Sequence, residues 1–319
     1  MTTPTSPELP PSSESGSLAP TIDAIVGGEF SRSRLAALSD LDRNRSAYLR
    51  TRWLDIPETE RHALLLALAE LSDDSLDFNF NRVYRIALED PNPIIRQLAI
   101  GDLWEDEGGD LPPRYVRMLQ TDPSDDVRAA AADALSSACE ATADGDSAAI
   151  ERETLIELFS NLIEDPAESP LVRRRCLGAI AAFGADPRIT ELIRLGLDDE
   201  DQTVVAGAVF AMGRTSNEKW LPELIEYLQS EDAELRYEAA RAAGLLAESD
   251  VVPELAELIY DPDGEVRTAA LAALGIIGGP AAIRALRQAE EDEDFEEAEI
   301  VDEALDAALL TVNPLDRQS

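Results

Sequence analysis

Along most of the chain, apolar residues recur every three to four positions, and short breaks rich in Asp, Pro and Gly separate these segments. This spacing is typical of amphipathic helices, because an α-helix completes one turn in about 3.6 residues. From about residue 40 onward, no run of β-branched residues recurs at every second position, as a half-buried strand would require. The pattern therefore predicts an all-α fold of short consecutive helices.

A motif of about 31 residues repeats along the chain. Six segments share an aliphatic residue, usually followed by arginine, with small residues three and six places later. The spacings of the arginine column are 32, 45, 32, 31 and 31 residues, and a weaker seventh copy places Val301 in this column 34 residues later. The longest spacing predicts a surface loop around 141–147. The arginine column consists of Arg96, Arg128, Arg173, Val205, Arg236 and Arg267.

Each repeat is expected to be a helix, an Asp-containing turn and a second helix. Good N-cap residues stand four places before the arginine column, where their side chains can accept the free N–H groups of a first turn; they are Asn92, Ser124, Ser169, Asp201, Asp232 and Asp263. Two places earlier, several repeats carry an aspartate: Asp90, Asp122, Asp199 and Asp261. We expect each arginine to bond the aspartate six residues before it, which would give a ladder of charge-assisted hydrogen bonds.

The small residues of the second helices allow neighbouring helices to approach closely. Because each helix pair then buries one side only, successive pairs must stack into a solenoid. The pattern Asp-Pro-x-x-x-Val-Arg-x-x-Ala-x-x-Ala-Leu-Gly resembles HEAT repeats, specifically the short HEAT-like class of phycobilisome lyases. The resemblance covers about 78–311 and implies a right-handed α-solenoid of stacked antiparallel helix pairs.

Four regions follow from these patterns. Residues 1–28 are expected to be a disordered tail rich in Pro, Ser and Thr, and 29–75 a divergent N-terminal helical cap. The solenoid is expected over 76–312, with an acidic last helix pair, and a short tail over 313–319.

Composition excludes several classes of function. The chain has 65 acidic and 27 basic residues, a net charge of −38, whereas nucleic-acid binding requires a positive surface. Adaptation of the host to salt or a GC-rich genome is a competing explanation for this acidity. No apolar segment is long enough to span a bilayer, and no export signal is visible, so we expect a cytoplasmic protein that does not bind membranes.

Few residues are available for metal or redox chemistry. His62 is the only histidine, and Cys139 and Cys176 lie in apolar helical segments without C-x-x-C spacing, so we expect reduced core thiols and no metal or other cofactor. The HEAT-like deoxyhypusine hydroxylases build a di-iron site from repeated His-Glu pairs, which one histidine cannot supply. We therefore expect no catalytic residues and a protein-binding scaffold; the alternative is a protein similar to phycobilin lyases or a cofactor chaperone.

The second helices line the concave wall of such a solenoid. Residues that stand one, two and five places after the arginine column point away from the buried face of their helix. The residue nine places after the column lies on the same side. Arginine and aromatic residues, which dominate protein interfaces, gather there in three consecutive repeats. The expected partner-binding strip, suited to acidic or aromatic groups of a protein, consists of Arg174, Arg175, Phe210, Arg214, Tyr237 and Arg241. The competing interpretation is that these residues only balance local acids.

A secondary candidate lies in the first repeat. Asp102 stands where an alanine is expected, and Trp104 stands where other copies end in a small residue. A carboxylate that faces the core is costly unless it is paired, so either Arg128 or an exposed edge accommodates it, or the site serves recognition.

Overall fold

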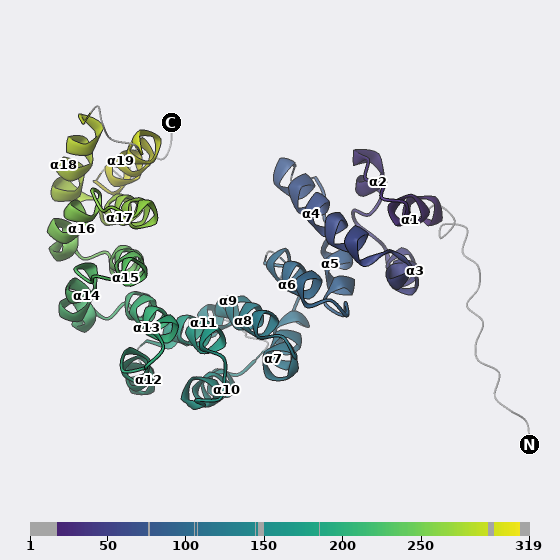
Figure 1. The fold of residues 1–319 in the computed structure, drawn as a ribbon, viewed down its shortest axis with the longest axis horizontal. Coiled ribbons are helices and arrows are strands. Elements are labelled where there is room, and N and C mark those ends of the chain that lie inside the picture. Colours follow the sequence, from purple (N-terminus) through teal and green to yellow (C-terminus); the bar gives the residue numbers. More distant parts are fainter. Residues whose placement is uncertain are drawn as a thin grey trace, which may run out of the picture. The chain divides into compact units, whose positions relative to one another are not determined.

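The computed structural model describes residues 18–75, 77–104, 106, 108–143, 145, 150–184, 186–292 and 297–312. Helices form all the regular structure of these ranges, and no strand occurs in them (Figure 1), which confirms the all-α prediction. The chain divides into two compact units. Unit 1 contains residues up to 111 together with 122–130, and unit 2 contains 112–121 and the residues from 131 onward.

In its described residues, unit 1 contains six α-helices and most of α8 (Asp125–Ala134). The six are α1 (Ala19–Val26), α2 (Arg32–Ala36), α3 (Arg43–Arg52), α4 (Glu58–Asp74), α5 (Asn81–Ala87) and α6 (Pro93–Gly101). The boundary between the units falls within α7 (Leu111–Thr121) and α8. Unit 1 therefore combines the expected cap with the first repeat.

Helix α1 corrects the expected tail over 1–28. Leu18, Ile22 and Ile25 are fully buried, and α1 lies beside α4. These residues stand at positions i, i+4 and i+7, so they form one apolar helical stripe directly after the Pro- and Ser-rich segment. Residues 18–28 thus belong to the folded part of unit 1. Residues 1–17 and 313–319, where the remaining tails were expected, lie outside the described residues.

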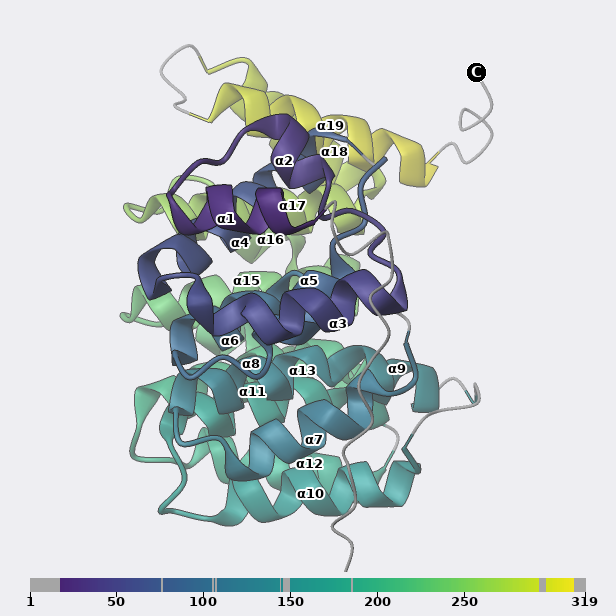
Figure 2. The same cartoon turned by 90° about the vertical axis from the view of Figure 1, so that its right-hand side faces the viewer.

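Unit 2 is a stack of helix pairs in two layers. Its helices are α9 (Ser136–Ala143), α10 (Arg152–Glu164), α11 (Pro170–Ile180), α12 (Pro187–Leu197), α13 (Gln202–Arg214), α14 (Leu221–Leu228), α15 (Ala233–Leu246), α16 (Val252–Leu258), α17 (Gly264–Ile277), α18 (Gly279–Glu290) and α19 (Ala298–Val312). The first helices of the pairs form the outer layer in Figure 1, and the second helices, α11, α13, α15, α17 and α19, form the inner layer. Figure 2 shows α13, α15, α17 and α19 one after another.

The loop expected around 141–147 is only partly described. Its first residues belong to α9, and Gly145 lies in a turn with a positive φ of 82°. Residues 144, 146 and 147 lie outside the described residues. The longer spacing therefore includes an additional helix.

Glycines set the close packing of the inner layer. A β-carbon on Gly244 would lie 3.1 Å from Cα of Ala273, and one on Gly275 would lie 3.1 Å from Cα of Ala304. Gly213 meets Ala242 in the same way and even more closely. These glycines, like their alanine partners, follow one another at intervals of 31 residues.

The same contacts correct the register of the last repeat. Because Ala304 takes the place of Ala273 one period earlier, α19 continues the 31-residue spacing. Val301, which is fully buried, is therefore equivalent to Ala270 and not to Arg267. The expected spacing of 34 residues was wrong by about one helical turn.

The arginine column forms a ladder between repeats. In two rungs, Nε and Nη2 of the guanidinium both donate to one carboxylate: Arg96 contacts Asp122 at 2.8 and 2.6 Å, and Arg236 contacts Asp261 at 2.7 and 2.9 Å. Further rungs join Arg173 to Asp199 at 2.6 Å and Arg267 to Glu297 at 2.6 Å. Bidentate pairs of this kind are among the strongest hydrogen bonds in proteins.

The carboxylate of each rung is not the one expected. The acid belongs to the turn of the following repeat, and for Arg96, Arg236 and Arg267 the residue six places before the arginine supplies its backbone carbonyl instead. Arg96 Nη1, for example, donates to the carbonyl of Asp90 at 2.8 Å, and Arg236 Nη1 donates to that of Ser230. Arg173 donates to the carbonyl of Ile163. Where the column carries Val205, the next turn carries Ser230 in place of aspartate, so both members of that rung are replaced.

The ladder predicts a purely structural effect for Arg267. Replacing Arg267 by Ala removes its bonds to Glu297 and to the carbonyl of Asp261 at 3.0 Å. Because the pair is partly buried, the free energy of unfolding should fall by about 1–2 kcal/mol. Chemical denaturation measures this loss, and binding per folded molecule should stay unchanged. An Arg267→Ala protein that unfolds normally but loses its partner would assign the column to binding instead.

Candidate functional site

The six residues of the expected strip lie on three neighbouring inner helices. Arg174 and Arg175 belong to α11, Phe210 and Arg214 to α13, and Tyr237 and Arg241 to α15. Helix α13 packs against both α11 and α15. Side chains of the capping residues Asp201 and Asp232 accept hydrogen bonds from backbone N–H groups in the first turns of α13 and α15 and so fix where these helices begin.

Two glycines lie beside side chains of the strip, and one of them is needed for a side chain to cross from helix to helix. A β-carbon on Gly207 of α13 would lie 2.7 Å from Cγ of Arg174, so only glycine leaves room for that side chain to pass. Gly178 of α11 lies under the ring of Phe210, whose Cδ1 would be 3.6 Å from an added β-carbon. Arg174 therefore reaches past α13 and contacts α15.

A buried carboxylate, Glu238 of α15, lies at the centre of the strip. Its side chain is 3% exposed and accepts hydrogen bonds from Arg174 Nη2 at 2.6 Å and from Arg241 Nη1 at 2.9 Å. Arg174 also donates to Glu234. Burial lowers the pKa of Arg174, but the bonds to these two acids outweigh it and leave the pKa above its usual value. The guanidinium groups are thus held in fixed positions.

Aromatic rings hold the other side of Arg241. Its guanidinium carbon lies 4.3 Å from the ring centroid of Phe210 and 5.5 Å from that of Tyr237. Both rings are partly exposed, so Phe210 is not buried between helices. Contacts of this kind stabilise a cation at a partly exposed site by about 0.5–2 kcal/mol.

The strip does not carry the positive charge that its sequence suggests. Arg175 lies 4.0 Å from Asp133, and Arg214 is paired with Glu140. Together with the pairs of Arg174 and Arg241, four arginines face four carboxylates. This balance supports part of the competing interpretation, that the strip neutralises local acids.

Asp102 and Trp104 lie in unit 1. No ion pair of Asp102 occurs among the residues that the structure describes. Trp104 is 80% exposed. Burial, together with the smaller effect of the nearby Asp73 charge, raises the pKa of the Asp102 carboxyl from an ordinary 3.8 to about 6. Burial also raises the pKa of Tyr84, to which the charge of Asp102 contributes. Arg128 instead bonds the carbonyl of Asp122 and the carboxylate of Asp125, so it does not provide the pairing that was considered for Asp102.

The raised pKa predicts a stability that depends on pH. Above pH 6 the Asp102 carboxylate is charged in both states and costs free energy only in the folded one, whereas below about pH 4 it is protonated in both. Asp102→Asn should therefore raise the free energy of unfolding at pH 7.5 by about 1–2 kcal/mol, after allowance for partial exposure. Denaturation at pH 7.5 and pH 4 measures the difference, which should vanish at the lower pH. An equal gain at both pH values would exclude the charge as its cause.

The two cysteines are buried free thiols. Both side chains are fully buried, as expected from the apolar segments that carry them. Burial raises the pKa of Cys139 to about 12 and that of Cys176 well above its usual value. Neither thiol is thus a nucleophile at neutral pH in the folded protein. Among the residues described, no three His, Cys, Asp or Glu side chains are grouped as metal ligands would be.

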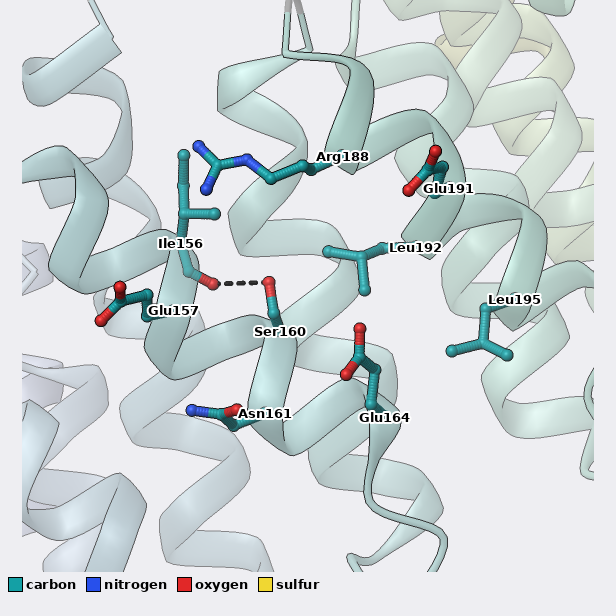
Figure 3. Close-up of a pocket in the computed structure, with 9 residues that line it drawn as sticks. All are labelled: Ile156, Glu157, Ser160, Asn161, Glu164, Arg188, Glu191, Leu192 and Leu195. Atoms are coloured by element: carbon teal, nitrogen blue, oxygen red, sulfur yellow. Dashed lines mark hydrogen bonds between the residues drawn. The ribbon is translucent and has the colours of Figure 1, made fainter.

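A groove that the sequence did not predict lies between α10 and α12 in the outer layer. It has a volume of about 720 Å³ and is lined by three glutamates with Leu192 and Leu195 (Figure 3). Arg188 at its rim is already paired with Glu153 and Asp186. The glutamates are Glu157, Glu164 and Glu191.

Comparisons with known proteins identify the repeat. The family described as HEAT repeats matches residues 221–306. No curated protein matches the chain. None of the described helices has both the length and the apolar character needed to cross a bilayer.

Several solved structures are similar to the chain at low sequence identity. The complex of CpcE and CpcF of phycocyanin lyase from Nostoc is 18% identical, with a TM-score of 0.53, and the match covers 88% of this chain and 98% of that one. Importin beta is 16% identical, with a TM-score of 0.47, over 93% of this chain and 44% of its own. Human deoxyhypusine hydroxylase is 20% identical, with a TM-score of 0.34, over 93% and 97%. Residues 221–306 are therefore HEAT repeats, and the all-helical chain has a solenoid fold of the HEAT and armadillo type.

Proposed function

We propose that this protein is a non-catalytic scaffold that binds a protein partner through the strip of Arg174, Arg175, Phe210, Arg214, Tyr237 and Arg241. One observation supports this proposal above the others. The Arg241 guanidinium lies over two partly exposed rings, and the buried Glu238 holds it in place. A cation and two rings fixed in this way lose little conformational entropy on binding, which is the property of interface hot spots.

The ion pairs limit which groups of a partner the strip can bind. Arg175 and Arg241 remain the most exposed arginines of the strip, although each has a carboxylate neighbour. We expect carboxylates of the partner at these two residues and an aromatic or other planar group against Phe210 and Tyr237. Arginine suits both contacts, since its planar guanidinium stacks and forms bidentate pairs.

The double variant Tyr237→Ala with Arg241→Ala tests the strip. The fold should persist, because Glu238 keeps its bond to Arg174 at 2.6 Å. The partner is captured from an extract of the source organism with the wild-type protein, identified by mass spectrometry and purified. Calorimetry should then show binding weakened by about 2 kcal/mol or more.

The matched control replaces the same two residue types elsewhere. Tyr260→Ala with Arg284→Ala changes an exposed tyrosine after α16 and an exposed arginine on α18. This variant should retain wild-type affinity. Wild-type affinity in the folded strip variant would refute the proposal. Transfer of a bilin to an acceptor thiol by the purified protein would instead favour the lyase alternative.

A further inference from the structure

Exposed aliphatic side chains follow the strip along the inner layer towards the C-terminus. Leu245 of α15 is 45% exposed and Ile276 of α17 is 56% exposed. Both stand nine residues after the arginine column, the position that Arg214 occupies on α13. The residue nine places after the arginine column is therefore charged on α13 and aliphatic on α15 and α17.

These side chains are neighbours on adjacent helices. Cδ1 of Ile276 lies 3.6 Å from the position of a β-carbon on Gly244, the residue before Leu245. On α19, the contact of Ala304 with Gly275 places the exposed Ala307 level with Ile276, and the exposed Leu310 follows one turn later on the same face. We call Leu245, Ile276 and Leu310 the aliphatic ridge.

The surface beside the ridge is uncharged and then acidic. Thr268 and Ala272 are the exposed residues of α17 on this side. On α19, the exposed Glu299 and Glu303 occupy the columns that hold Tyr237 and Arg241 on α15. No ion pair of either glutamate occurs within the described part of the chain. A partner at this place thus meets aliphatic groups next to unpaired negative charge.

The spacing of the ridge fits a helix. Packed helices lie about 8–10 Å apart, so Leu245 and Ile276, which stand at equivalent positions, are separated by about that distance, and Leu310, one turn further along α19, lies somewhat farther from Ile276. Residues i and i+7 on one face of an α-helix are about 10.5 Å apart. A helix laid across α15, α17 and α19 can therefore place an apolar residue at each ridge position.

We propose that the aliphatic ridge binds the apolar face of an amphipathic helix whose flanking basic residues pair with Glu299 and Glu303. Isolated exposed apolar residues are ordinary on soluble proteins, whereas a contiguous row of them is typical of a binding surface. Charge complementarity selects a basic helix, because the acids beside the ridge have no described cation. The proposal does not depend on the strip, whose contacts involve other residues.

The test uses three synthetic helical peptides of about 18 residues, each about 27 Å long, so that one face can carry apolar residues at i, i+7 and i+14. One has leucine on one face and lysine on the other; the second replaces lysine by glutamate, and the third replaces leucine by serine. Fluorescence anisotropy with the full chain should give at least about tenfold tighter binding of the Leu/Lys peptide than of either control. Equal binding of the Ser/Lys peptide would reduce the effect to general attraction by an acidic protein and overturn the proposal.

Variants of the full chain locate the site. Leu245→Ser with Ile276→Ser should weaken binding of the Leu/Lys peptide by about tenfold or more. Leu195→Ser is the matched control, because Leu195 is 43% exposed but lies on the outer layer, and it should leave binding unchanged. Glu299→Gln with Glu303→Gln should weaken binding and reduce its dependence on salt. An equal loss in Leu195→Ser would place the peptide elsewhere.

Two further measurements distinguish other occupants of the aliphatic ridge, namely a second copy of this chain and its own C-terminal segment. Light scattering that shows a wild-type dimer, and a monomer for the Leu245→Ser/Ile276→Ser variant, would assign the ridge to a second copy of this chain. Tighter peptide binding after Leu315→Ser would assign it to the chain's own C-terminal segment. Either result overturns the proposal of a basic helical partner.

Discussion

Replacing Arg61 by alanine is expected to lower the free energy of unfolding of unit 1 by about 3–5 kcal/mol. Arg61 donates to Asp90 from Nε at 2.7 Å and from Nη2 at 3.3 Å. The Asp90 side chain is 0% exposed. Without Arg61, a buried carboxylate keeps only its neutral donors, the Trp53 indole at 2.7 Å and the backbone N–H of Asn92 at 2.8 Å. An uncompensated buried charge is among the costliest defects in a folded protein.

Arg50→Ala is the control for this substitution. Arg50 contacts Glu89 at 2.7 Å, but both side chains are more than half exposed. Its loss should cost less than about 1 kcal/mol, since water replaces the partner. Urea denaturation followed by circular dichroism measures both variants. Equal and small losses would mean that the burial of Asp90 does not determine the stability of unit 1.

A second large effect is expected for Gly213→Ala. The new β-carbon would collide with Cα, Cβ and the carbonyl oxygen of Ala242, so α13 and α15 would have to separate. Overpacking against backbone atoms should lower the free energy of unfolding by about 2–3 kcal/mol, although alanine favours the helix by about 1 kcal/mol. The same separation would loosen the contact of Arg241 with Phe210, which spans these two helices.

Gly101→Ala provides the comparison, because no atom lies within 4 Å of its β-carbon position. Gly101 is the last residue of α6, and its replacement should change stability by no more than about 0.5 kcal/mol. Thermal unfolding of both variants gives the difference. If Gly213→Ala unfolds like the wild-type protein, α13 and α15 are less tightly packed than the glycine contact indicates.

Local patterns predicted the repeats well because the relevant physics lies within one helix pair. The capping residues Asn92, Asp201, Asp232 and Asp263 all accept a hydrogen bond from the first turn of their helix. Ser169 precedes α11 without such a bond. Within α1, the apolar stripe was hidden by the Pro- and Ser-rich composition of the preceding segment.

The partners of charged residues were harder to predict because they lie in other repeats. Arg96 and Asp122 are 26 residues apart, a separation that follows from the stacking of pairs and not from any local pattern. One repeat carries Val205 in place of the arginine and Ser230 in place of the aspartate. This simultaneous change of both residues is a signal of their pairing that the sequence contains. In the strip, the alignment of equivalent positions in successive repeats places Arg241 near Phe210, as the structure does. The bond of the buried Glu238 to Arg174 was not predictable in this way, because it depends on the space that Gly207 leaves on the helix between them.

The replaced rung has a consequence for how unit 2 transmits cooperativity. In a linear array, each repeat is stabilised by its own helices and by its coupling to the next repeat. The turns join α13 to α15 without an arginine rung, so coupling at this joint depends on the close packing of Gly213 against Ala242 and on the contacts of Arg241 with Phe210 and of Arg174 across α13. A ligand seated on these side chains would therefore strengthen the coupling constant of this joint, and the repeats on its two sides would melt more nearly together.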